Sequence, residues 1–286
     1  SEPSAASQME TSSFAVAFSN FRGTAAPSGS GLTQRGYEPC GCRGQRGPSL
    51  WACAVGAGTV EVMTRVGLVQ LAVEESEPVQ ERIQRTLAGA TAAAAHAEMV
   101  MLPELWPTGA FDLELGVEYA QSIDGPLVTE LSDVAASAKT WLHGGSFVER
   151  GGDDEYFNTS VVFNPQGDLV ATYRKIHLFG FDTGEAATLT AGSDVVVVDT
   201  PLGRTALATC YDLRFPELFR AHIDNGATSV LLTSGWPSLR IARWNLLAAA
   251  RACENQMWVI GCNEVGHHGG QDLGGHSLIA DPWGEV

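Results

Sequence analysis

The chain has 286 residues, of which 44% are hydrophobic, so it can bury a large core as one large or two small domains. Its formal charge of -16 argues against a nucleic acid or an anionic membrane as partner, because either polyanion would repel it. No apolar run approaches the length that crosses a bilayer. We therefore expect a protein that acts on a small molecule.

Residues 1–62 are rich in Ser, Gly, Ala and Pro, and contain four Arg, four Glu and no Lys, Asp, His or Ile. Such a segment has too little periodic apolar surface to offset the loss of chain entropy on folding, so we predict a disordered, low-complexity extension. The first regular pattern opens at Met63. We expect one domain over residues 63–286, which carries the whole net charge.

From Met63 the pattern alternates between strands and helices. A strand over 65–72 precedes a helix that Ser76 is expected to cap, with Pro78 in its first turn. The further strands are predicted over 98–104, 142–149, 158–164, 168–175, 194–200, 204–210, 228–234 and 257–265, and the further helices over 126–140, 213–224 and 239–254. Several strands are apolar on both faces, so helices should cover the sheet, which indicates an α/β fold.

The six cysteines lack the spacing of a disulfide framework or a zinc site. Reduced thiols in a cytoplasm are the simplest interpretation, so we expect a cytoplasmic protein. Cys40 and Cys42 have no accompanying CxxC or Cys/His pair, and His267 and His268 have no third ligand. No phosphate-binding loop or dinucleotide fingerprint is present either, so we expect neither a metal nor a cofactor.

Cys210 ends one predicted strand and precedes a predicted helix, for which Asp212 is the expected N-cap and Pro216 lies in the first turn. At such an elbow, the partial positive charge of the helix N-terminus lowers the pKa of a thiol, and free amides can bind an oxyanion. Taken alone, a cysteine with apolar neighbours is more often a core residue. The thiol becomes a candidate nucleophile only if charged side chains at the ends of other strands lie beside it.

A carboxylate and an ammonium also follow strands. Glu104 comes directly after an apolar strand that Pro103 ends, and Lys175, one of two lysines in the chain, has apolar flanks. A buried lysine requires a carboxylate or an oxyanion as partner. The alternatives are a surface loop glutamate and a solvated lysine. Because open α/β sheets place their chemistry at the carboxyl ends of strands, we expect the three groups to meet.

Together the segments LPELWPTG, YRKIHLF and CYDLRFPEL resemble the three signature segments of the nitrilase-like carbon-nitrogen hydrolase superfamily. The resemblance runs from Met63 to Val286 and is strongest to the amidase branch that includes omega-amidases and deaminated glutathione amidases. It implies an α-β-β-α sandwich, a homodimer or higher homo-oligomer, and a Glu-Lys-Cys triad. The family normally continues beyond a segment like DPWGEV, so we expect the domain to be C-terminally incomplete.

Carried onto this chain, the resemblance implies that Glu104, Lys175 and Cys210 form the triad, with Glu185 as a second carboxylate. These residue types predict hydrolysis of a small amide through a cysteine thioester. Glu104 would take the thiol proton and later serve the leaving ammonia and the water. Lys175 and the backbone amide of Tyr211 would hold the oxyanion, while Glu185 would orient the ammonium and keep it charged.

The substrate pocket is expected to include Phe111 and Trp236, which follow strand ends and are plausible walls. The amidase resemblance suggests a short acyl chain with its own carboxylate, such as an omega-amide of a keto acid. In an acidic protein this substrate needs a local cation, for which Arg240 and Arg243 are the candidates. Arg214 is expected to pair with a carboxylate beside the elbow, in a structural role.

Two other interpretations stay open. The same triad could hydrolyse a nitrile or an N-carbamoyl amide, because all three reactions share the attack step, and an incomplete chain could bind without turnover. A serine hydrolase is disfavoured, since the HGGS segment at 143–146 is not accompanied by a GxSxG elbow. Ammonia release from amides, nitriles and carbamoyl amino acids separates the enzymatic alternatives.

Overall fold

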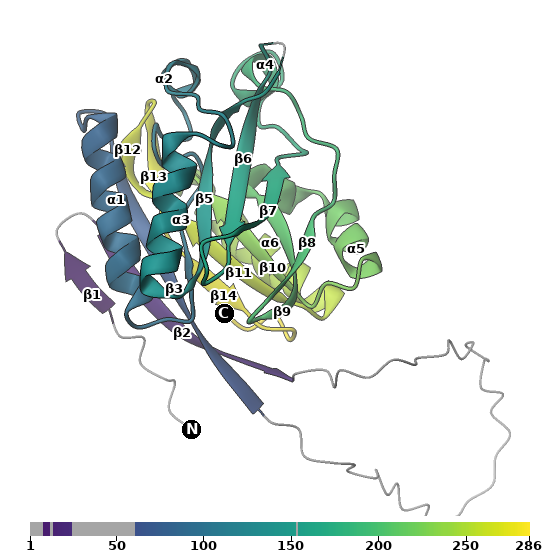
Figure 1. Cartoon of the computed structure of the whole chain (residues 1–286). Helices are drawn as coiled ribbons and strands as arrows, with labels where there is room; N and C mark the ends of the chain where they lie inside the picture. The colour runs from purple at the N-terminus through teal and green to yellow at the C-terminus, as the bar shows by residue number, and fades with distance from the viewer. Residues whose placement is uncertain (1–7, 12–13, 25–60, 153) are drawn as a thin grey trace, which may run out of the picture.

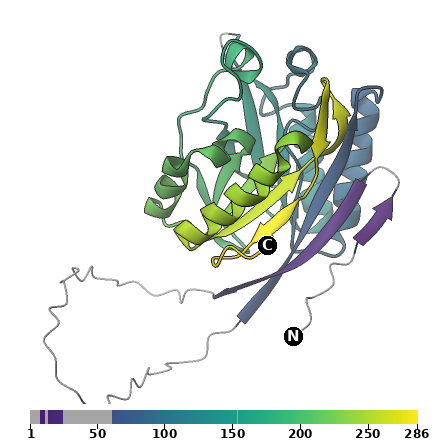
Figure 2. The same ribbon diagram turned by 180° about the vertical axis from the view of Figure 1, so that it is seen from behind.

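The computed structural model describes residues 8–11, 14–24, 61–152 and 154–286, with side chains from Thr64 onward. The described residues form two β-sheets that pack face to face, with helices on both outer faces (Figure 1). Helices α1 and α3 cover the first sheet, and the reverse view shows α5 and α6 over the second (Figure 2).

The first sheet has the order β1-β2-β3-β4-β5-β6-β7, and β12 and β13 extend it beside β3. Its strands are β1 (Gln8–Thr11), β2 (Phe14–Thr24), β3 (Glu61–Glu74), β4 (Met99–Met101), β5 (Trp141–Arg150), β6 (Tyr156–Phe163), β7 (Leu169–Arg174), β12 (Val265–His268) and β13 (Gln271–Gly274). Strands β3, β4 and β5 run parallel, so the chain segments after them emerge at one end of the sheet.

The second sheet has the order β14-β11-β10-β9-β8. Its strands are β8 (Val197–Thr200), β9 (Gly203–Thr209), β10 (Ser229–Ser234), β11 (Trp258–Asn263) and β14 (Leu278–Ala280). The central strands β9, β10 and β11 are parallel, and the two edge strands pair antiparallel. The helices are α1 (Val79–Ala94), α2 (Leu113–Glu118), α3 (Pro126–Ala138), α4 (Glu185–Thr188), α5 (Pro216–Asp224), α6 (Ile241–Asn255) and the short 3-10 helices η1 (Cys210–Arg214) and η2 (Ser238–Arg240).

Three apolar layers hold these elements together. The first lies between the first sheet and helices α1 and α3, where Ile83 and Leu131 are buried. The second fills the space between the sheets and includes Leu68 and Leu207. The third lies between the second sheet and helices α5 and α6, around Trp244. This layering confirms the α-β-β-α sandwich.

Strands β1 and β2 lie within the segment predicted as an extension; they pair antiparallel with each other, and β2 also runs along β3. The physical reason is readable in the sequence: from Phe14 to Phe18 large apolar residues alternate with alanine, the period of a strand. Cys40 and Cys42 lie outside the described residues. A smaller correction concerns α1, whose N-cap is Pro78 and not Ser76.

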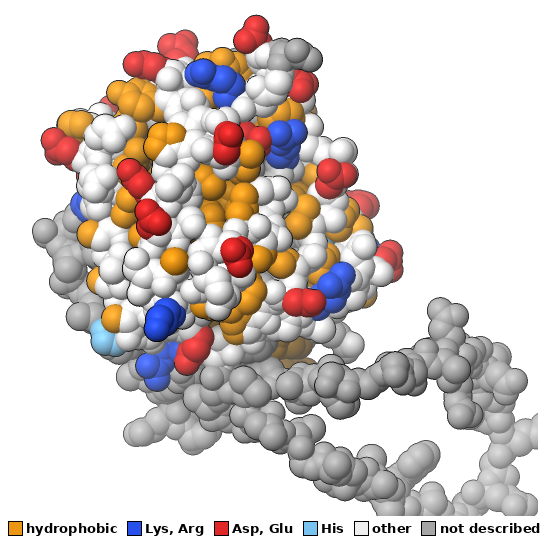
Figure 3. All heavy atoms as spheres, in the orientation of Figure 1, with side chains coloured by type: hydrophobic (Ala, Val, Ile, Leu, Met, Phe, Trp, Pro, Cys, Tyr) orange, Lys and Arg blue, Asp and Glu red, His pale blue; other side chains and the backbone are white. Residues whose placement is uncertain are grey.

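Over the described residues, no helix combines the length and the apolar character needed to cross a membrane. On the face that carries α1 and α3, acidic and basic side chains lie scattered and do not gather into a basic patch (Figure 3).

Candidate active site

Cys210 lies where β9 meets η1, at the predicted strand-to-helix junction. Its backbone φ is +46°, in the left-handed region that costs a non-glycine residue about 1–2 kcal/mol. Strain of this kind persists only where the surrounding structure fixes the backbone, and it clusters at functional sites. The turn of η1 moves the N-cap of α5 to Phe215, so the prediction of Asp212 as that cap is wrong. Asp212 instead accepts a hydrogen bond from the backbone amide of Thr209 at 2.9 Å.

Glu104 follows β4 and is 2% exposed. Its Oε1 accepts hydrogen bonds from Lys175 Nζ at 2.7 Å and from Asn158 Nδ2 at 2.9 Å. Its Oε2 accepts one from the amide of Gly235 at 2.9 Å. Donors on both oxygens hold the carboxylate in one orientation, and Oε2, which accepts a single hydrogen bond, retains a further lone pair for a proton.

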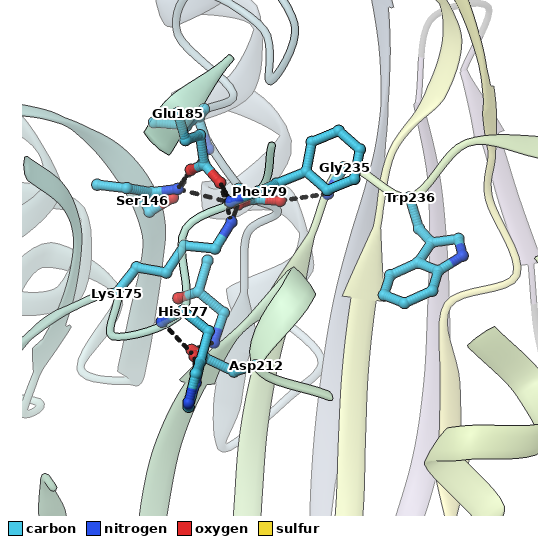
Figure 4. A network of polar contacts seen from close by, with 12 residues as sticks. Ser146, Lys175, His177, Phe179, Glu185, Asp212, Gly235 and Trp236 are labelled. Atoms are coloured by element: carbon cyan, nitrogen blue, oxygen red, sulfur yellow. Dashed lines mark hydrogen bonds and ion pairs between the residues drawn. The ribbon is translucent and has the colours of Figure 1, made fainter. Parts of the chain in front are cut away.

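Lys175 follows β7 and is 1% exposed. Its Nζ donates to Glu104 Oε1 at 2.7 Å and to Glu185 Oε2 at 2.5 Å (Figure 4). Burial by itself lowers the pKa of the ammonium, but Glu104, Glu185 and Cys210 outweigh it and hold the pKa of Lys175 well above its usual value. The ammonium is therefore charged at neutral pH, as a donor to an oxyanion must be.

Asn158, on β6, belongs to the same network and was not identified from the sequence. Its Nδ2 donates to Glu104 Oε1 at 2.9 Å and to Glu185 Oε1 at 2.7 Å, so one amide bridges the two carboxylates. Glu185 Oε2 also accepts from the amide of Phe179 at 2.8 Å. Burial raises the pKa of Glu185, Lys175 opposes this rise and Glu104 adds to it. The network thus carries one cation between two carboxylates.

The HGGS segment braces the loop of Glu104. Strand β5 bulges within 143–146, where Gly145 has a φ of +66°. Ser146 Oγ accepts a hydrogen bond from the amide of Leu105 at 2.9 Å. A Cβ at Gly145 would lie 2.2 Å from the carbonyl oxygen of Pro103, so this position requires glycine. The segment supports the carboxylate and is not an oxyanion loop.

The thiol of Cys210 interacts with Glu104 and Lys175. Burial raises its pKa well above the ordinary value, and the negative charge of Glu104 raises it further, while Lys175 and the hydroxyl of Ser234 oppose the rise. A thiol with a raised pKa is protonated at rest and needs a base in order to react. The interaction of the thiol with the Glu104 carboxylate supplies such a base.

A further carboxyl group lies behind Gly235. A Cβ at Gly235 would lie 2.5 Å from Ala110 Cβ and 2.9 Å from Glu264 Oε2, so only glycine fits. Glu264 is fully buried, and neither of its oxygens has a hydrogen-bond partner among the described residues. Burial and the neighbouring Glu104 raise the pKa of Glu264 well above its usual value, which keeps this carboxyl group neutral.

A cavity of about 220 Å³ opens onto these groups, and its size suits a small substrate. It is lined by eight of the nine residues that the sequence predicts for the site: Glu104, Phe111, Lys175, Glu185, Cys210, Tyr211, Trp236 and Arg240. The exception is Arg243, which lies exposed on α6 and does not line the cavity.

Arg214 also lines the cavity, which the sequence analysis missed. Its guanidinium carbon lies 5.0 Å from the ring centroid of Trp236 and 5.8 Å from that of Tyr211. Within the described part of the chain it forms no ion pair with a carboxylate, in contrast to the structural pairing predicted for it. No three His, Cys, Asp or Glu side chains of that part group closely enough to hold a metal ion.

Comparisons with known proteins find one matching family model, similar sequences and similar solved structures. Residues 65–286 match the family model of the carbon-nitrogen hydrolases. A 2-oxoglutaramate amidase of Paenarthrobacter nicotinovorans is 40% identical over 228 residues, which cover 77% of this chain and 77% of that protein. The omega-amidase NIT2 of Homo sapiens is 36% identical over 234 residues, covering 78% and 82% respectively. Among solved structures, Saccharomyces cerevisiae Nit3, of the nitrilase superfamily, matches with a TM-score of 0.69 and 31% identity over 77% of this chain and 82% of that chain.

Proposed function

Because the chain belongs to the carbon-nitrogen hydrolase family, we propose that Cys210, Glu104 and Lys175 hydrolyse a small amide through a thioester. The observation that carries the proposal is the position of Lys175 Nζ, 2.7 Å from Glu104 and 2.5 Å from Glu185, in the wall of the cavity that Cys210 also lines. A thiol, a base and a fixed cation therefore face one small space.

In the first half-reaction, Glu104 takes the proton of Cys210 and the sulfur attacks the carbonyl carbon of the amide. The negative charge that develops on the carbonyl oxygen is stabilised by Lys175 Nζ and by the backbone amide of Tyr211. Glu104 then gives its proton to the amide nitrogen, the carbon-nitrogen bond breaks, and ammonia leaves a thioester on the sulfur.

In the second half-reaction, Glu104 takes a proton from water, and the hydroxide attacks the thioester carbon. The carbon-sulfur bond breaks, the proton returns to the sulfur of Cys210, and the acid product leaves. Glu185 and Asn158 hold Lys175 and Glu104 in place through both halves. The position of the ammonium is fixed because the amide of Asn158 also holds both of its carboxylate partners.

We propose that the substrate carries its own carboxylate, as in the omega-amide of a 2-oxo acid. Two relatives are named for 2-oxoglutaramate and omega-amide hydrolysis. Arg240 and Arg214 both line the cavity, and within the described residues neither pairs with a carboxylate. Arg240 lies over the ring of Phe179 at 5.4 Å. Two unpaired guanidinium groups in an acidic protein fit a substrate carboxylate, for which their fork geometry is suited.

The test is ammonia release from a panel: 2-oxoglutaramate, an aliphatic amide of equal length without a carboxylate, the matching nitrile and an N-carbamoyl amino acid. We expect the carboxylate-bearing amide to be preferred. Arg240→Met and Arg214→Met should each lower kcat/KM about 10- to 100-fold, the worth of a charge-assisted hydrogen bond. Arg243→Met, outside the cavity, is the matched control. A preference for the neutral amide, or equal losses in all three variants, would refute the assignment of the carboxylate.

We further propose a homodimer that buries the α6 side of the sandwich. Leu239 in η2, Leu246 on α6 and Trp283 after β14 are 85%, 67% and 85% exposed, and Gly284, next to Trp283, lies beside Ala249 and Cys253 of α6. Light scattering after gel filtration decides the oligomeric state. The described cysteines are free thiols, which fits a reducing cytoplasm, to be checked by fractionation of the host cells.

A further inference from the structure

Asp212 connects the segment that carries Lys175 to the elbow that carries Cys210. Its side chain is 0% exposed, and it does not line the substrate cavity. Figure 4 shows Asp212 bonded to His177, on the side of Lys175 away from Glu185. The triad chemistry makes no use of this carboxylate, so its burial needs another explanation.

Both oxygens of Asp212 are saturated with donors. Oδ2 accepts from the hydroxyl of Tyr173 at 2.7 Å and from the amide of Thr209 at 2.9 Å. Oδ1 accepts from the amide of His177 at 3.0 Å and from its Nδ1 at 2.7 Å. Because a carboxylate only accepts, Nδ1 carries the proton in this contact.

The four donors come from the immediate neighbours of the reacting groups. Tyr173 and His177 stand two residues before and two residues after Lys175, and Thr209 directly precedes Cys210. The carboxylate of Asp212 therefore links the residues on either side of Lys175 in the sequence to the residue that precedes Cys210. Since β7 belongs to the first sheet and β9 to the second, these bonds also cross between the sheets.

Two further contacts stiffen the same joint. The hydroxyl of Tyr173 accepts a hydrogen bond from the amide of Ile176 at 3.3 Å, which fixes the turn after Lys175. The ring of His177 stacks on that of Phe215, with centroids 3.7 Å apart and planes 8° apart. The turn and the elbow are thus joined by polar bonds at one side and by a ring stack at the other.

We propose that Asp212 is a positioning residue, which sets the distance between the ammonium of Lys175 and the thiol of Cys210 without touching the substrate. The inference rests on the proposed function, which gives both groups a part in the reaction. Misplacement of a catalytic group by about 1 Å can cost about 100-fold in rate, so a joint that fixes two such groups has a direct effect on turnover.

The test compares Tyr173→Phe and Asp212→Asn with Thr140→Val. Tyr173→Phe removes the hydroxyl at nearly constant shape, and with it the hydrogen bond to Asp212 and the one from the amide of Ile176. Asp212→Asn replaces one acceptor oxygen by an amide nitrogen. Thr140→Val removes a part-buried hydrogen bond of 2.9 Å to the carbonyl of Ala97, and neither residue lines the cavity, so it controls for a loss of stability alone. We expect kcat to fall about 10- to 100-fold in the first two variants, with KM nearly unchanged, and to stay at the wild-type value in Thr140→Val.

A second readout needs no amide substrate: the rate at which iodoacetamide alkylates each cysteine, mapped by peptide mass spectrometry. A displaced Lys175 no longer favours the thiolate, so alkylation of Cys210 should slow about tenfold in both variants. General loosening would have the opposite effect, with faster modification that extends to the buried Cys262.

Alkylation and kcat of Tyr173→Phe that equal those of Thr140→Val would overturn the inference, and this comparison stands even if Asp212→Asn does not fold. A wild-type protein that hydrolyses no amide would refute the proposed function separately, because the alkylation rates still decide the role of Asp212.

Discussion

Replacement of Lys175 by arginine keeps the positive charge and changes its shape, so it tests whether catalysis depends on where the ammonium lies. Nζ is a single atom that lies 2.7 Å from Glu104 and 2.5 Å from Glu185, in a side chain that is 1% exposed. A planar guanidinium spreads its donors over a wider fork. It cannot satisfy both carboxylates through one nitrogen and keep a donor on the oxyanion.

The expected loss follows from these contacts. Removal of one aligned oxyanion donor costs about 100- to 1,000-fold in kcat. The larger group must also fit among packed neighbours at a position that is 1% exposed, which costs about 1–3 kcal/mol of the free energy of unfolding. For a domain of this size, that cost lowers Tm by roughly 2–12 °C. The loss of rate should therefore exceed what the loss of stability explains.

The assay is steady-state ammonia release, with Tm measured on the same preparations and intact-mass spectrometry of rapidly quenched reactions. Lys139→Arg is the matched control, because Lys139 is the other lysine of the chain and lies exposed at the end of α3. We expect the control to behave as wild type and Lys175→Arg to accumulate no thioester. If Lys175→Arg retains more than about a tenth of wild-type kcat, the reasoning about donor geometry is wrong.

Three other predictions are independent of this one. Cys210→Ala should fold and show no turnover, and the wild-type acyl adduct should map to Cys210; an adduct on Cys253 or Cys262 would contradict the site. Truncation to Met63 should leave amide hydrolysis intact, because the family match begins at residue 65. Loss of activity on truncation would contradict this and would mean that the pairing of β2 with β3 is needed for catalysis. Burial lowers the pKa of His222 to about 4 in the folded protein. As pH falls, His222 is therefore protonated in the unfolded chain before it is protonated in the folded protein, and the free energy of unfolding decreases between pH 6.5 and 4. His222→Leu should flatten this loss by about 1.4 kcal/mol per pH unit in urea titrations, and an unchanged slope would refute it.

The sequence was sufficient to place the proposed triad at strand ends, because each of its three residues comes at or directly after the end of a predicted strand. Cys210 and Lys175 are adjacent to strands whose burial pattern is visible in the letters, and Pro103 marks the end of the run before Glu104. The residue types that follow a strand are local information. Local patterns also predicted that helices cover a sheet, since strands apolar on both faces require helices outside them, whereas the two-sheet sandwich was implied by the family resemblance.

Partners that depend on how strands and loops come together could not be found in this way. Asn158 is one polar residue within a strand, and its two carboxylate partners, Glu104 after β4 and Glu185 in α4, are 54 and 27 residues away in sequence. Asp212 was predicted to cap a helix because the amide donors of the next helical turn are close to it in sequence, whereas its actual donors include Tyr173, 39 residues earlier in the chain. The sequence predicted that Arg243 faces the substrate and that Arg214 has a structural role, whereas Arg214 lines the cavity and Arg243 does not. Which guanidinium faces the cavity depends on the orientation of α6 and η1, which is not a local property of the sequence.

The groups of the proposed triad come from different halves of the sandwich: Glu104 and Lys175 follow strands of the first sheet, and Cys210 follows a strand of the second. Neither sheet on its own contains a nucleophile and its base, so the reaction begins only when the two sheets have docked. The recovery of turnover after dilution from denaturant therefore reports that docking, and should lag behind the recovery of secondary structure. Leu207 and Ile260 lie in the apolar layer between the sheets. A smaller side chain at either position should let the sheets shift slightly, which would move the sulfur of Cys210 relative to the ammonium of Lys175 and slow the reaction although neither residue touches the site.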